Sequence, residues 1–134
     1  MGNNKTFESL VLAQEYADGR SAELSEKLGT KVTPIIFYEK KNTNDAGAPE
    51  TWDFAIAYLK KPTLAIKCQV LDRMTAGEVS EAQKFLLYNV IIKEESDPIF
   101  FSTEQTDEVE EILMGAYIAA GKMVKVKSDV TKKN

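Results

Sequence analysis

At 134 residues, the chain is long enough to bury one hydrophobic core and too short to form two domains that each have a sizeable core. Its 43% hydrophobic and 28% charged content is that of an ordinary globular protein, and its net charge of −4 argues against binding nucleic acid by general phosphate neutralisation. The chain has no histidine, and its single cysteine allows neither an internal disulfide nor a zinc–thiolate cluster.

The start of the chain has no basic segment followed by an apolar block, so the sequence predicts no signal peptide. No span approaches the roughly 20 apolar residues that a membrane helix needs. We therefore expect a cytoplasmic protein that does not contact a membrane.

Residues 5–29 have helical spacing. Within residues 6–18, Phe7, Leu10 and Val11 belong to one apolar face, and the following Asp18-Gly19 pair predicts a stop. Ser21 as a cap and Gly29 as a terminator predict a second short helix. We expect a helical segment over residues 5–29 that is broken in the middle.

Residues 34–60 predict a β-hairpin. The segment 35–40 is rich in β-branched and aromatic residues, and Pro34 restricts it to a strand start or a sheet edge. Turn-forming residues fill positions 42–49, and a second strand begins at Thr51. The large-residue face of this second strand should meet the helices; it consists of Trp52, Phe54, Ile56 and Tyr58.

Helical spacing returns over residues 63–92. Pro62 ends the strand, Thr63 can cap the next helix, and Thr75-Ala76-Gly77 predicts a break. Before the break, the predicted apolar face includes Leu64, Ile66, Cys68, Val70, Leu71 and Met74. After it, residues 85–92 are apolar almost all round, which predicts a buried helix. A strand over residues 88–92 is the alternative that periodicity does not exclude.

A last helix is predicted over residues 103–123. Ser102 and Gln105 have capping-box spacing, and acidic residues in the first turns suit the helix dipole. Together these elements predict an α+β fold in one domain over residues 1–124, in which a β-hairpin packs against four to five helices. Residues 125–134 predict a flexible basic tail.

The sequence predicts no catalytic, cofactor-binding or metal site. Without histidine, Ser-His and Cys-His nucleophile pairs are excluded. Lys67 should lay its stem along apolar surface, Cys68 should be an inert core residue, and Asn89 should satisfy buried backbone groups. Dipole complementation explains the acidic cluster formed by Glu104, Asp107, Glu108, Glu110 and Glu111.

Two features point to partner binding. Small residues four apart in the last helix would let another helix approach closely, although packing within the chain is the favoured explanation. The basic tail and the loop over residues 42–50 are segments that could order on assembly. The candidate interface comprises Gly115, Ala116, Ala119, Ala120, Lys122, Lys125 and Lys127.

One pattern resembles a known group of proteins. A strand ends in Lys60-Lys61-Pro62-Thr63, a helix follows, then Phe85-Leu86-Leu87-Tyr88-Asn89, a turn and a last amphipathic helix. This pattern, over about Lys31 to Ala120, resembles small proteins from the virion-assembly modules of tailed bacteriophages, some of them tail-assembly-chaperone-like. The resemblance implies a protein without enzymatic activity that contacts other phage structural proteins.

Three functions follow from these observations. The first is a non-catalytic bacteriophage structural or assembly protein, either a virion component or a tail-assembly chaperone. It would act by self-association or by binding other phage proteins, in the host cytoplasm and, as a component, in the virion. The second is a cellular adaptor or oligomerising module, and the third is an enzyme that works without histidine.

Overall fold

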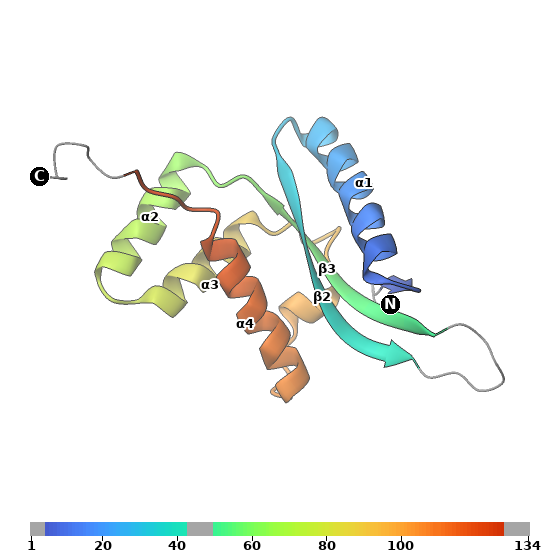
Figure 1. The fold of residues 1–134 in the computed structure, drawn as a ribbon. Helices are drawn as coiled ribbons and strands as arrows, with labels where there is room; N and C mark the ends of the chain where they lie inside the picture. The colour runs from blue at the N-terminus through green and yellow to red at the C-terminus, as the bar shows by residue number, and fades with distance from the viewer. Residues whose placement is uncertain (1–4, 43–49, 128–134) are drawn as a thin grey trace, which may run out of the picture.

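The computed structural model describes residues 5–42 and 50–127, which form a three-stranded sheet and a set of helices (Figure 1). The elements are β1 Lys5–Phe7, α1 Leu10–Leu28, β2 Val32–Asn42, β3 Thr51–Lys60, α2 Leu64–Thr75, α3 Val79–Val90, the 3-10 helix η1 Pro98–Phe101, and α4 Asp107–Gly121. Both strand pairings are antiparallel, and the strand order is β1-β3-β2. This arrangement confirms the predicted α+β class.

Strand β3 lies in the middle of the sheet, and both of its faces are covered. The residues from Phe54 to Leu59 are all at most 3% exposed. Figure 1 shows α1 on one side of the β2–β3 hairpin and the other helices on the opposite side. Every side chain in the middle of β3 therefore packs against a helix or a helical turn, whichever way it points.

The two faces of β3 pack against different helices. Its large-residue face, with Phe54, Ile56 and Tyr58, packs against Ala13, Ala17 and Leu24 of α1. Its small-residue face, with Ala55, Ala57 and Leu59, packs against α3, α4 and Phe100 of η1. The sequence led us to place the helices on the large-residue face. That prediction was wrong for the main helical group, because the alanines leave room for bulky helical side chains.

The second edge of β3 is completed by a segment that is not a strand. Strand β1 pairs only with residues 52–54 of β3. Beyond it, the backbone N–H of Ile92 donates to the Tyr58 carbonyl at 2.9 Å, and the N–H of Asp97 donates to the Ile56 carbonyl at 2.9 Å. The Ser96 hydroxyl accepts from the Tyr58 N–H at 3.1 Å. Residues 92–97 thus satisfy the backbone groups that a neighbouring strand would otherwise pair.

The N-terminal segment differs from the prediction. Residues 5–7 form a strand, and α1 continues through Gly19 as one helix. Ser9 caps α1 by accepting a hydrogen bond from the Leu12 N–H, and Gly29 ends it with a φ of 68°. A glycine inside a helix costs only about 1 kcal/mol relative to alanine, so burial of Ala13, Ala17 and Leu24 on the sheet outweighs the break signal at Asp18-Gly19.

The later helices form where the sequence predicts them, but α4 begins at Asp107 and not at residue 103. Thr63 caps α2 as predicted, and the break falls at Gly77, whose φ is 85°. Helix α3 ends at Val90, so the alternative strand over residues 88–92 is wrong; Ile91 makes one bridge with Leu59. Helix α4 is capped by Thr106, whereas Ser102 accepts from the Glu104 N–H in a local turn. Residues 43–49 and 128–134, which hold most of the loop and tail, lie outside the described residues.

At Gly115, α4 packs closely against Phe37 of β2. A Cβ atom added at Gly115 would lie 2.6 Å from Cε1 of Phe37, whose ring also packs on Phe100. We expect Gly115→Ala to lower the free energy of unfolding by about 1 to 3 kcal/mol, because an overpacked contact must shift. Urea denaturation followed by circular dichroism measures this change.

Gly19 provides the matched control. It lies in α1, and a Cβ atom there would meet nothing within 4 Å. Gly19→Ala should raise stability by roughly 0.5 to 1 kcal/mol through helix propensity alone. Equal stabilisation by both substitutions would show that α4 does not need a glycine against Phe37.

Candidate functional site

An apolar hollow lies on the α1 face of the sheet, where the sheet extends past the start of α1. It has a volume of about 430 Å³, and we call it the edge hollow. Leu10 and Tyr38 on its rim are 58% and 54% exposed. Tyr38 packs edge-on against Phe54, with ring centroids 5.9 Å apart. Its lining residues are Glu8, Ser9, Leu10, Ile36, Tyr38, Trp52 and Phe54.

The edge hollow adjoins the outer backbone edge of β2. The Val32 N–H donates to Ser25 Oγ at 2.9 Å, and the Val32 carbonyl accepts from the Ser21 hydroxyl, so this residue's backbone points away from β3. Backbone direction alternates along a strand, which aims the backbone groups of Ile36 and Tyr38 the same way. Among the described residues, β2 has no strand on that side.

Several features limit strand pairing along this edge. Pro34 has no N–H to donate, and the pairing of β2 with β3 is irregular between Tyr38 and Lys40. Lys40 and Lys41 follow, and such charges discourage edge-to-edge association. The open part of the edge is therefore short, and it coincides with the two β2 residues that line the edge hollow.

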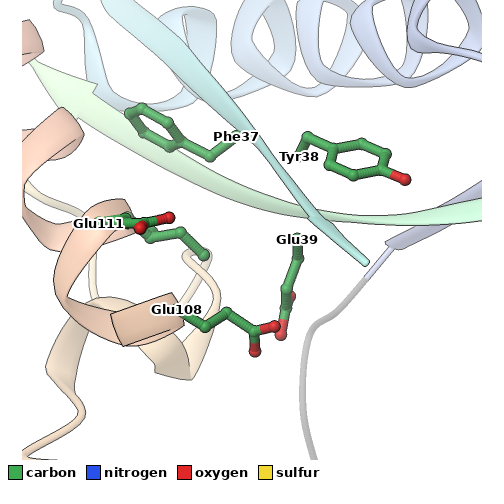
Figure 2. Close-up of a pocket in the computed structure, with 6 residues that line it drawn as sticks. Phe37, Tyr38, Glu39, Glu108 and Glu111 are labelled. Atoms are coloured by element: carbon green, nitrogen blue, oxygen red, sulfur yellow. The ribbon is translucent and has the colours of Figure 1, made fainter. Parts of the chain in front are cut away.

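A second hollow, of about 390 Å³, lies between β2 and α4 on the other face of the sheet. Figure 2 shows Glu39 extending from β2 toward Glu108 of α4, with Glu111 on the same helix. Phe37 and Ile112 supply the apolar part of the lining. We call this the acidic hollow.

The Glu39 carboxyl group is in an unfavourable environment for a charge. Its Oε1 atom is buried and has no hydrogen-bond partner. Burial raises the pKa of Glu39, and the nearby carboxylates of Asp97, Glu108 and Asp53 raise it further. The acidic hollow therefore favours a protonated Glu39 and would favour a cationic group placed beside it.

The acidic residues do not form a metal centre in this structure. Among residues 5–42 and 50–127, no group of three or more histidine, cysteine or acidic residues could hold a metal ion. Asp107, Glu108 and Glu110 lie in the first turn of α4, where negative side chains complement the helix dipole. Electrostatic stabilisation of the helix start accounts for most of this cluster.

The predicted interface residues on α4 divide into two sets. Ala116 and Ala120 are fully buried in the main core, and Gly115 packs against Phe37, so these residues serve packing within the chain. Ala119 is partly buried, and Lys122, Lys125 and Lys127 are exposed. Contact with a partner stays a prediction for the lysines.

Three single residues have positions that the sequence did not fully reveal. Cys68 is exposed rather than in the core, and Asn89 is exposed as well, donating to the Phe85 carbonyl at 2.7 Å. The prediction for Cys68 was wrong because α2 buries Val70 instead of the side with Cys68. The prediction for Asn89 was wrong because α3 buries the expected side with Ala82, Leu86 and Val90, and Asn89 lies outside it. Lys67 is half-buried on α2.

The sequence alone did not indicate that the lining residues form the edge hollow. One signal for it was available: the consecutive apolar residues Leu10, Val11 and Leu12 cannot all lie on one helix face, and all three are exposed. The pairing of Tyr38 with Phe54 depends on strand register, which the sequence left open.

Comparison with protein-family models, with curated proteins and with solved structures gives no match for this chain. Among the helices of the described residues, none is both long enough and apolar enough to cross a membrane.

The raised pKa of Glu39 leads us to expect that its effect on stability depends on pH. A raised pKa in the folded state means that the contribution of Glu39 to stability is full below the ordinary glutamate pKa and is lost as pH rises through the folded-state value. Glu39→Gln should therefore stabilise the protein at pH 7, by less than about 1 kcal/mol because solvent still reaches the side chain. Thermal unfolding at pH 7 and pH 4 measures the difference, which should shrink at pH 4.

The control for this substitution is Glu26→Gln, which changes an exposed glutamate on α1. It should leave stability nearly unchanged at both pH values. A Glu39→Gln variant that is less stable than the parent at pH 7 would contradict the proposed repulsion.

Proposed function

We propose that this protein is a non-catalytic bacteriophage structural or assembly protein that works through protein–protein contacts, as a virion component or a tail-assembly chaperone. The observation that carries the binding role is the edge hollow. It combines Trp52, Tyr38 and Leu10 around a concave apolar surface next to open backbone groups of β2. Tryptophan and tyrosine are the residue types that most often dominate binding energy at protein interfaces.

The phage context of this proposal comes from the resemblance over about Lys31 to Ala120, and the lack of histidine supports a role without catalysis. Host cytoplasm is the proposed location during assembly. The acidic hollow and the exposed lysines at 122, 125 and 127 supply charged surfaces of both signs for contacts with other phage proteins or with a second copy.

Mass spectrometry of purified particles and of infected-cell lysate tests this role. A stoichiometric amount in particles identifies a virion component, whereas presence in lysate alone identifies an assembly factor. Constant amounts in uninfected cells would overturn the phage assignment and favour a cellular adaptor.

A double substitution on the rim of the edge hollow tests whether this hollow is the binding surface. Leu10→Asp combined with Tyr38→Thr removes two apolar groups from the rim, while aspartate suits a helix start and threonine suits a strand. In complementation of a phage that lacks this gene, we expect at least a tenfold loss of infectious particles, the order of effect of losing about 1.4 kcal/mol of binding.

The matched control is Ile118→Thr, which removes an apolar group that is 51% exposed on α4, away from the edge hollow. It should support normal particle yield. Equal yields from both variants, with unchanged circular dichroism spectra, would show that the edge hollow is not the binding surface.

A further inference from the structure

Helix α2 packs on the rest of the protein through one side only. Val70 is 1% exposed and Ile66 packs against the main core. The Arg73 guanidinium lies 4.3 Å from the centroid of the Phe85 ring on α3. These three residues define the inner side of α2, and α3 is the helix it mainly contacts.

The outer side of α2 carries an apolar seam. Leu64 and Leu71 are 76% and 45% exposed. Cys68, which lies between them, and Thr75, which follows them, are also exposed. These positions follow a spacing of four, three and four residues, which is the spacing of the contact positions in a two-stranded coiled coil. At 100° per residue, the seam lies opposite Ile66, Val70 and Arg73. We call these four residues the α2 seam.

The charges beside the α2 seam would be complementary between two copies of α2 if the two helices were parallel. Lys67 flanks the seam on one side and Asp72 on the other, five residues later in the chain. In a parallel pair of helices, this five-residue offset places each lysine beside the aspartate of the other helix. In an antiparallel pair, the two Lys67 side chains would meet each other. Within residues 5–42 and 50–127, neither Lys67 nor Asp72 forms a salt bridge.

We propose that a second copy of this chain docks on the α2 seam, forming a parallel, two-fold symmetric helix pair joined by two Lys67–Asp72 ion pairs between copies. A two-fold axis makes the same surface serve both partners, which a self-complementary seam requires. Figure 1 shows α2 at the end of the molecule farthest from the β2–β3 hairpin, so the bulk of each copy lies away from the contact.

The proposed contact is small. It uses about three turns of one helix from each copy, so it falls below the roughly 1,200 Å² of a standard stable interface. We therefore expect a weak, concentration-dependent dimer, with a dissociation constant on the order of 100 μM. This inference concerns self-association of the purified protein and does not require a phage context, so it can fail while the proposed function stands.

Charge reversal tests both the partner and the orientation. In sedimentation equilibrium of the full chain between about 10 μM and 1 mM, a range chosen to bracket the expected dissociation constant, we expect the parent protein to dimerise. Lys67→Glu should weaken the dimer at least tenfold, because it places two carboxylates together in each flank. Lys67→Glu combined with Asp72→Lys exchanges the two charges, so that opposite charges again face each other on both sides of the α2 seam. The double variant should therefore return the dissociation constant to within about threefold of the parent.

Two further measurements complete the test. Cys68 lies in the α2 seam, and its thiol is the only one in the chain, so mild oxidation should give a disulfide-linked dimer that Lys67→Glu suppresses. Thermal unfolding confirms that each variant is folded. A monomeric parent protein at 1 mM, a concentration about tenfold above the expected dissociation constant, would overturn the proposal. So would a dimer unaffected by Lys67→Glu, or failure of the double substitution to restore association.

Discussion

Burial of β3 on both faces and along both edges is the constraint on which the rest of this structure depends. A strand buried on two faces requires helices on each side, and its backbone groups require partners along its whole length. Strand β2 supplies one edge, while β1 and residues 92–97 supply the other. Arg20 of α1 holds this last segment in place: its Nε donates a hydrogen bond to Glu95 Oε1 at 3.0 Å, and its Nη2 forms an ion pair with Glu95 Oε2 at 2.9 Å.

This arrangement also determines where the molecule is left open. Because residues 54–59 of β3 are buried, the open surface lies farther out, where the outer edge of β2 has no strand partner among the described residues next to the start of α1. Helix α2 lies one layer farther out, against α3, and buries only Val70. Several of the apolar side chains that the core does not bury therefore lie at the edge hollow and on the α2 seam.

The two surfaces suit different kinds of partner. The edge hollow is concave, with aromatic side chains and nearby backbone groups, which suits an inserted side chain or a short extended segment. The α2 seam is convex and regular, which suits another helix. The acidic hollow differs from both, since burial, together with the nearby carboxylates of Asp97 and Glu108, raises the pKa of Glu39. Together they offer three separate surfaces for contacts with other molecules.

The sequence by itself determined the α+β class, the hairpin strands, the break at Gly77 and the cap at Thr63, because turn, capping and periodicity signals act over a few neighbouring residues. Tertiary structure decided which faces those elements bury. The continuous α1, the outward position of Cys68 and the close contact of Gly115 with Phe37 all depend on partners distant in the chain. Local spacing shows that α2 has two apolar sides, but only the packing of Val70 and Arg73 on α3 shows which side stays free.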